Sequence, residues 1–253
     1  EHNARLQQII AAEMLAAGGR LSFARFMELA LYTPGLGYYS GGSLKLGAKG
    51  DFMTAPEWSP LFTRCLARQA AQVLAVLGGG DILEVGAGSG LMAADLLETL
   101  AASGSLPNRY FILERSGELR ARQGALLQER LPQLRGRIVW LDRLPESGFR
   151  GVIVANELLD ALPAHCFVLT EQGAAERYVQ REGERWQWCL GQVSDEALAQ
   201  RIDKLQHDEG LVTGYSSEVN LAAEAWVRSI AGILAAGMLL LIDYGFTRHE
   251  DYQ

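Results

Sequence analysis

Residues 83–90 of the chain read Leu-Glu-Val-Gly-Ala-Gly-Ser-Gly, and this stretch decides the fold. A short apolar run ends in it, and a helical apolar pattern begins after it at Leu91, so we expect a turn between a strand and a helix. Glycines tolerate tight turns and let a ligand approach the backbone. The next helix presents free N–H groups and a partial positive charge. The stretch therefore predicts a cofactor-binding turn in an α/β domain.

Short apolar runs and helical patterns alternate beyond this turn. The runs cover residues 81–85, 109–114, 137–141, 151–155 and 238–242, with helices at about 91–102, 117–130 and 218–234. Uninterrupted apolar strands with helices between them favour a parallel sheet covered on both faces. The fold class predicted is therefore α/β, with a doubly wound, Rossmann-like core.

Two regions depart from this alternation. Residues 164–191 contain three short alternating runs that predict an inserted β-meander, followed by a charged helix at about 195–206. Upstream, helical patterns cover about 4–17, about 22–32 and 60–77. We predict two parts: a helical and loop-rich N-terminal extension over 1–78, and a core over 79–253 with an insertion at about 164–215.

The glycine pattern is E-x-G-x-G-x-G, with Gly86, Gly88 and Gly90 as its glycines. A dinucleotide fingerprint requires glycine or alanine at the sixth position, where this chain has Leu91. S-adenosylmethionine suits the pattern, because its carboxylate can meet the helix N-terminus and Glu84 can attract its ammonium. A dinucleotide site and a purely structural turn stay open at this point.

Two acidic residues end the next strands. Glu114 follows the run Tyr-Phe-Ile-Leu and is placed to receive the ribose hydroxyls of S-adenosylmethionine, although it could equally serve the ribose of NAD. Asp142 ends the third strand, where it could reach the edge of an adenine ring or simply be a solvated loop residue.

A second polar cluster follows the fourth strand. Open α/β sheets bind ligands beyond the carboxyl ends of their strands, and Asn156 and Glu157 emerge there. Glu157 could orient a guanidinium nucleophile and accept its proton, while Asn156 could anchor cofactor or substrate through its amide. Asp160 could face the same pocket or serve only as an acidic residue early in a helix. Glu218 begins the long helix at 218–234 and is either catalytic or an ordinary helix-start residue. A metal site is not predicted, because His165 has no second ligand near it in the sequence.

Taken together, these segments resemble the MidA-like family of class I S-adenosylmethionine-dependent methyltransferases, which includes a mitochondrial complex I assembly methyltransferase. The likeness lies in six stretches that occur in the same order, namely residues 31–39, 50–59, 83–90, 155–163, 214–220 and 242–245.

The resemblance implies a seven-stranded core, an N-terminal extension near the cofactor, and protein arginine as the substrate class. It implies that residues 50–59 help to close the pocket, with Asp51, Thr54 and Glu57 as polar contacts. Asp51 and Thr54 could instead only stabilise their own loop. The family usually continues well past the Asp-Tyr-Gly of residues 243–245, so we expect its last two strands to be absent from these 253 residues.

Composition limits the classes of partner. Acidic residues exceed basic residues by 30 to 23, a net charge of −7, which argues against a general nucleic-acid binder. No apolar run approaches the roughly 20 residues of a membrane span, and the first residues lack a signal-peptide pattern. The three cysteines show no CxxC spacing, which favours a reducing compartment and no structural zinc. A bacterial cytoplasm or a mitochondrial matrix would both fit.

The hypothesis is a methyltransferase that uses S-adenosylmethionine to methylate a nitrogen of a protein, most simply of arginine. One alternative is a non-catalytic assembly factor that keeps the cofactor pocket. Another is an NAD-dependent oxidoreductase, against which Leu91 argues. A small-molecule acceptor also stays open, and the sequence carries no signal of the oligomeric state.

Overall fold

Residues 2–39 and 55–245 are described by the computed structural model, and their contacts divide them into two units. The parallel-sheet unit comprises residues 55–158 and 227–243. The antiparallel-sheet unit comprises residues 2–39, 159–226 and 244–245. This division groups segments by their contacts, whereas the predicted division cuts the chain at one point, after residue 78. The predicted division stays a prediction.

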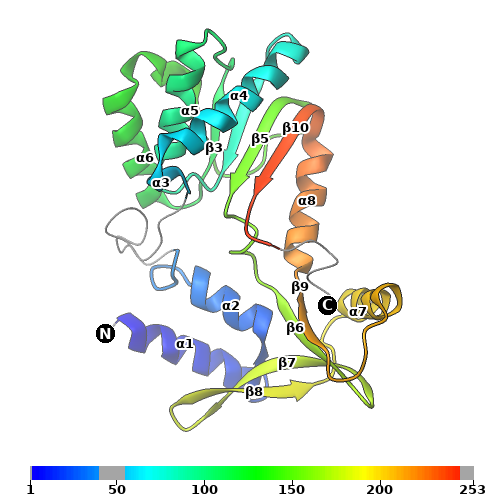
Figure 1. The fold of residues 1–253 in the computed structure, drawn as a ribbon. Coiled ribbons are helices and arrows are strands. Elements are labelled where there is room, and N and C mark those ends of the chain that lie inside the picture. Colours follow the sequence, from blue (N-terminus) through cyan, green and yellow to red (C-terminus); the bar gives the residue numbers. More distant parts are fainter. Residues whose placement is uncertain (1, 40–54, 246–253) are drawn as a thin grey trace. The chain divides into compact units, whose positions relative to one another are not determined.

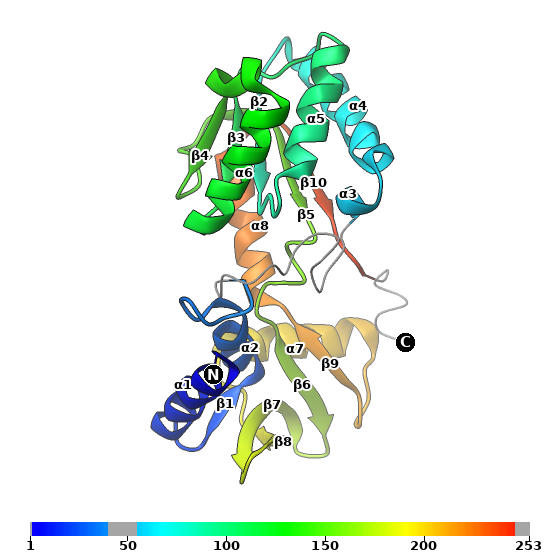
Figure 2. The ribbon, with the colours of Figure 1, turned by 90° about the vertical axis from the view of Figure 1, so that its left-hand side faces the viewer.

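Five parallel strands form the sheet of the first unit, in the order β10-β5-β2-β3-β4. Figure 1 labels β10, β5 and β3, and Figure 2 also labels β2 and β4. Their bounds are β2 (Asp81–Val85), β3 (Tyr110–Leu113), β4 (Ile138–Leu141), β5 (Phe149–Asn156) and β10 (Leu234–Ile242). All five strands predicted from the apolar runs are thereby confirmed. The strand expected at 238–242 starts earlier, because β10 pairs with β5 from Leu234 onward.

Helices on both sides bury this sheet. They are α3 (Ala55–Trp58), α4 (Pro60–Leu77), α5 (Leu91–Ala102), α6 (Gly117–Arg130) and η1 (Pro132–Arg137), and α8 (Leu221–Ile233) includes the boundary between the units. Ile82 packs in one cluster with side chains of α4, α5 and α6, which lie together beside the sheet in Figure 2. Its neighbour Leu83 points to the opposite face and is also fully buried. Burial on both faces explains why these strands are uninterrupted apolar runs.

Local signals for helix ends are confirmed where they were specific. The Ser22 hydroxyl caps α2 (Phe23–Tyr32) by accepting the N–H of Arg25. Ser59 caps α4 in the same way, with Pro60 in the first turn and Gly78 in a left-handed conformation at the end. Among the helices of residues 2–39 and 55–245, none is long and apolar enough to cross a membrane.

The second unit is built on an antiparallel sheet. Its strands are β1 (Arg20–Ser22), β6 (His165–Thr170), β7 (Gly173–Glu182), β8 (Arg185–Gly191) and β9 (Ser216–Val219), and its helices are α1 (His2–Ala16), α2 and α7 (Glu196–Glu209). The predicted meander is confirmed as β6, β7 and β8. The pairings of β1 with β7 and of β9 with β6 were not predicted. They extend the inserted hairpins into a five-stranded sheet.

Two small cores cover the two faces of this sheet. On one side, α1 and α2 pack through Ile10, Met14 and Leu29 against Val179 of β7. On the other side, α7 packs its apolar stripe against β6 and β9 through the buried residues Phe167, Leu169, Leu198, Ile202, Leu205 and Val219.

The start predicted for the long helix is wrong. Glu218 lies in β9, where it pairs with Cys166 of β6, and α8 begins only at Leu221. Asn220 caps this helix, since its side-chain oxygen accepts the N–H of Ala223 at 2.8 Å. Ser and Glu residues favour a helix start, but they are equally compatible with a short edge strand. Here the segment is a strand because it pairs with β6.

Candidate functional site

The glycine-rich turn lies between β2 and α5, as expected. Gly86, Gly88 and Gly90 have positive φ angles of 73°, 53° and 84°, which side chains other than glycine rarely adopt. A Cβ atom at Gly86 would also lie 3.1 Å from Leu158 Cδ1. The backbone of this loop is therefore held close to its neighbours and cannot carry larger residues without strain.

The N-terminus of α5 is linked to a carboxylate from another helix. The hydroxyl of Ser89 accepts the N–H of Leu91 at 3.3 Å and donates to Oε1 of Glu57 in α3. Glu57 was predicted as a polar contact at the pocket, and the structure brings it to the glycine loop. The companion residues Asp51 and Thr54 lie outside the described residues.

Glu84 is buried on β2 directly before the loop, with 1% of its surface exposed. Its Oε2 accepts the hydroxyl of Tyr110 at 2.6 Å, whereas its Oε1 is buried without a hydrogen-bond partner among the described residues. Burial raises the pKa of Glu84 to about 7, the charge of Glu114 adds to this effect, and the bond from Tyr110 partly offsets it. The site thus holds an acceptor oxygen that the described chain does not satisfy.

Strand register brings the predicted polar residues to one edge of the sheet. Glu84 lies beside Ile112 of β3 and Val154 of β5. Glu114 lies two positions after Ile112, just beyond the end of β3, and Asn156 lies two positions after Val154, at the end of β5. Side chains two positions apart along a strand point to the same face, so these two share a face of the sheet with Glu84. This edge is where open α/β sheets bind ligands.

The carboxylate of Glu114 is held by two donors. Its Oε1 accepts the N–H of Ser116 at 2.9 Å, and its Oε2 lies 3.4 Å from Nε2 of Gln123. The same Nε2 donates to the carbonyl of Gly88 at 3.0 Å, and Oε1 of Gln123 accepts the indole N–H of Trp140 at 2.9 Å. The glycine loop and the end of β3 are thereby joined through one buried side chain of α6.

Asp142 follows β4 and is largely exposed. It forms an ion pair of 2.7 Å with Arg120, and 88% of its side-chain surface is accessible. Arg120 also donates to the backbone carbonyls of Glu114 and Leu141, both at 2.5 Å. Arg120 thus ties together the carboxyl ends of β3 and β4, which are the strand ends that carry the predicted ribose and adenine contacts.

Asn156 and Glu157 mark the end of β5. Oδ1 of Asn156 is buried and has no hydrogen-bond partner among the described residues. Within the described part of the chain, Glu157 is the one residue other than glycine with a positive φ, at 49°. Its N–H donates to the carbonyl of Ile242 at 2.8 Å, which holds this conformation in place. Sparsely populated backbone conformations such as this one cluster at functional sites.

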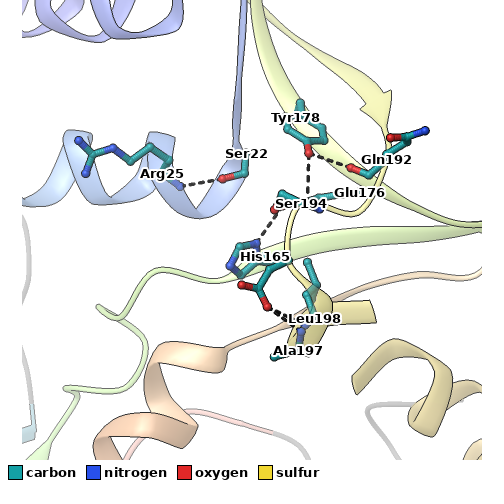
Figure 3. A network of polar contacts seen from close by, with 10 residues as sticks. Ser22, Arg25, His165, Glu176, Tyr178, Gln192, Ser194, Ala197 and Leu198 are labelled. Atoms are coloured by element: carbon teal, nitrogen blue, oxygen red, sulfur yellow. Dashed lines mark hydrogen bonds and ion pairs between the residues drawn. The ribbon is translucent and has the colours of Figure 1, made fainter. Parts of the chain in front are cut away.

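Two further candidates from the sequence lie in the antiparallel-sheet unit. Glu218 occupies β9. Nδ1 of His165 is hydrogen-bonded to the buried carboxylate of Glu176 at 2.8 Å, and the N–H of Ser194 donates to the same carboxylate at 2.7 Å (Figure 3). Over residues 2–39 and 55–245, no group of three His, Cys, Asp or Glu side chains is gathered that could hold a metal ion.

A separate hollow of about 400 Å³ lies along α6 and β4. Its lining includes none of the candidate residues at the carboxyl edge described above. Its lining is mostly apolar and consists of Gly124, Ala125, Leu127, Gln128, Arg135, Ile138 and Trp140.

Sequence reasoning missed Gln123, Tyr110 and Arg120. Their side chains bind those of the predicted ligands Glu114, Glu84 and Asp142, respectively. Gln123 is fully buried and shares a helix face with Leu127, four residues later. A polar residue on the apolar stripe of a helix was therefore a signal present in the sequence. Its partners, however, come from segments up to 35 positions away.

The doubly wound parallel sheet and its glycine-rich loop define the class: this is a Rossmann-like class I methyltransferase fold. Residues 65–253 match the model of the family described as "Putative S-adenosyl-L-methionine-dependent methyltransferase", and the chain belongs to this family.

Curated relatives include proteins named "Protein arginine methyltransferase NDUFAF7, mitochondrial". The Danio rerio protein is 29% identical over 92% of this chain and 60% of its own length. The Homo sapiens protein is 28% identical over 90% of this chain and 56% of its own length. The chain thus spans somewhat more than half the length of these relatives.

Solved structures from Burkholderia thailandensis match the whole chain. One, described as bound to S-adenosyl-homocysteine, has a TM-score of 0.91 and 42% identity, and the match covers 65% of that protein. A native structure from the same organism has a TM-score of 0.88 and 41% identity over 64% of its chain.

Proposed function

We propose that this protein binds S-adenosylmethionine and transfers its methyl group to a nitrogen of an arginine in another protein. Family membership and the names of the relatives support this proposal. One structural observation carries it furthest. Oε1 of Glu84 and Oδ1 of Asn156 are buried acceptors without partners among the described residues. Glu84 lies on β2, which leads into the glycine loop, and Asn156 lies on the neighbouring strand β5. A ligand with several N–H donors would satisfy them.

The remaining groups of the site suit the other parts of the same cofactor. The free N–H groups of α5 and the loop would receive its carboxylate, and Gly86, Gly88 and Gly90 leave room for it. Glu114 has acceptor capacity left for the ribose hydroxyls beyond its two protein donors. Asp142 would contact the adenine edge. Thr54, outside the described residues, is retained as a proposed cofactor contact.

When bound, S-adenosylmethionine supplies an electrophilic methyl group, so that a C–S bond breaks as a C–N bond forms and S-adenosylhomocysteine leaves. The protein must aim the acceptor nitrogen and take up the proton that this nitrogen loses. We assign both tasks to Glu157, whose carboxylate can hold a guanidinium by charge-assisted hydrogen bonds. Asn156 would anchor the cofactor or substrate, and Glu218 stays a proposed catalytic residue.

The compartment follows from the organism in this proposal. The relatives carry mitochondrial names, so a eukaryotic source would place the protein in the mitochondrial matrix. A bacterial source would place it in the cytoplasm.

Binding is tested first, by isothermal titration with S-adenosylhomocysteine and with NAD. We expect micromolar binding of S-adenosylhomocysteine only, and its loss in Gly86→Val, where a side chain meets both backbone strain and Leu158. Gly124→Val is the matched control, because a Cβ at Gly124 contacts nothing within 4 Å. Binding of NAD instead would support an oxidoreductase.

Transfer is tested next, with a peptide that contains arginine and its counterpart that contains lysine. Methylation of the arginine peptide, lost in Glu157→Gln while S-adenosylhomocysteine still binds, would support the assigned role. Full methylation by Glu157→Gln would refute that role. Tight cofactor binding without any transfer would favour the non-catalytic alternative.

A further inference from the structure

Gln123 is a buried polar side chain that contacts the glycine loop. It lies in the second turn of α6 and has no exposed surface. Its amide makes contacts with Gly88, Glu114 and Trp140, which belong to the loop, to the end of β3 and to β4. A buried amide with partners on three elements restrains all three.

The chemistry of these partners allows only one orientation of the amide. An indole N–H can only donate, so Oε1 of Gln123 must face Trp140. A backbone carbonyl and a carboxylate can only accept, so the NH₂ group must face Gly88 and Glu114. Turning the amide over would set donor against donor and acceptor against acceptor, and Trp140 therefore locks the direction in which Gln123 donates.

Gln123 also shapes the loop by contact. A Cβ atom on Gly90 would lie 3.1 Å from Cγ, 3.2 Å from Cα and 3.3 Å from Cβ of Gln123. The glycine at position 90 is thus required partly because α6 lies against the loop at this residue. The same side chain meets the loop through its stem and through its amide.

We propose that Gln123 is a positioning residue that orients the Glu114 carboxylate toward the ribose hydroxyls and holds the glycine loop at the matching distance. This inference rests on the proposed binding of S-adenosylmethionine. Ser116 restrains one oxygen of Glu114 and Gln123 the other, so that the plane of the carboxylate is set from two sides. The free lone pairs then point to where a vicinal diol can donate to them.

The test compares S-adenosylhomocysteine with its 2′-deoxy analogue by isothermal titration. If Glu114 is well placed, the wild-type chain should prefer the ribose form by about tenfold, as expected for a hydrogen bond to a charged group. In Gln123→Met this preference should shrink to about twofold, because the carboxylate is no longer held. A merely structural role would weaken both ligands equally and leave the preference unchanged.

Two further variants guard this comparison. Gln128→Met is the matched control, since Gln128 is exposed on the same helix, and it should keep the tenfold preference. Trp140→Phe removes the donor that orients the amide and keeps an aromatic ring at this position. It should give an intermediate preference, which keeps the test decisive if Gln123→Met does not fold.

The outcomes separate the two proposals. If the wild-type chain binds neither ligand, the proposed function is overturned and the role of Gln123 with it. If it binds S-adenosylhomocysteine but Gln123→Met and Trp140→Phe keep the full tenfold preference, only the role of Gln123 is overturned.

Discussion

Glu84 of the parallel-sheet unit and Glu176 of the antiparallel-sheet unit are both buried carboxylates, with 1% and 0% of their surfaces exposed. Glu176 accepts from His165, from the backbone of Ser194 and, at 3.4 Å, from the hydroxyl of Tyr178 (Figure 3). Among the residues that the structure describes, Glu84 accepts only from Tyr110, and its second oxygen has no partner.

The pKa values of the two groups follow these surroundings. Burial alone would raise the pKa of Glu176, but its bonds from His165 and Ser194 outweigh burial and lower it. At Glu84 burial dominates, and the pKa rises to about 7. The difference distinguishes a carboxylate whose partners come from its own chain, which is structural, from one that still has room for a partner from outside.

The largest expected effect is the loss of stability when Glu176, the carboxylate with partners from its own chain, is replaced. Glu176→Leu should lower the free energy of unfolding by roughly 4 kcal/mol, because it leaves His165 and the N–H of Ser194 without their buried acceptor. Chemical denaturation followed by circular dichroism measures this. Glu182→Leu, an exposed carboxyl on the same strand, is the matched control and should change stability little. A loss below about 1 kcal/mol for Glu176→Leu would remove the structural role.

The next effect is the pH dependence of stability at Glu84. Its folded pKa of about 7 exceeds its ordinary value of 4.5, so between these values the folded state binds more protons than the unfolded state. Glu84 therefore costs stability as the pH rises. The free energy of unfolding of the wild type, relative to Glu84→Gln, should fall by about 2 to 3 kcal/mol from pH 5 to pH 8.

Glu176 should show the opposite pH dependence, because its pKa is lower in the folded state than in the unfolded state. It therefore contributes stability at pH values above its ordinary pKa, and this contribution is lost as the pH falls through the lowered pKa. The control for Glu84 is Glu146→Gln, an exposed carboxyl of the same unit. A flat difference between wild type and Glu84→Gln across this range would contradict the burial effect.

A smaller effect concerns binding. If the ammonium of the cofactor pairs with Glu84, binding requires the carboxylate form, and the affinity for S-adenosylhomocysteine should fall by about tenfold from pH 8 to pH 6. In Glu84→Gln the affinity should be weaker at pH 8 and independent of pH over this range. Titration calorimetry in buffers of different ionisation enthalpy would also detect the proton released on binding. If the affinity of the wild type and of Glu84→Gln changed equally with pH, the proposed pairing of Glu84 with the ammonium would be contradicted.

The smallest effect is expected at the exposed carboxylate. Asp142→Asn should change the free energy of unfolding by about 0.5 kcal/mol or less, because exposed ion pairs contribute little. Thermal unfolding of the variant beside the wild type checks this. A loss of several kcal/mol would show that the pair between Asp142 and Arg120 holds β3 and β4 together, which the backbone bonds of Arg120 are expected to do without it.

Much of the parallel-sheet unit could be predicted from the sequence. Its strands are continuous apolar runs because both faces are covered, and its loop needs glycines because three residues adopt positive φ. These are local requirements, and each leaves a local trace. The placement of Glu84, Glu114, Asn156 and Glu157 at one edge follows from the parallel topology itself.

The antiparallel-sheet unit was predicted less well, because its outer strands depend on distant partners. Leu21 of β1 pairs with Val179, and Glu218 of β9 pairs with Cys166. Nothing within residues 20–22 or 216–219 marks these short segments as strands. They become strands because edges of β6 and β7 are available to pair with them.

Local patterns in the chain were thus sufficient to specify the fold class, the glycine loop and the acidic residues around it, because apolar periodicity and glycine conformations act within a few neighbouring residues. The surroundings of those acidic residues emerged only from the folded chain. Tyr110 meets Glu84 across 26 positions, and Gln123 meets Gly88 across 35. Whether a buried carboxylate is satisfied depends on such long-range hydrogen bonds and on the desolvation that accompanies them, and neither is encoded near the residue itself.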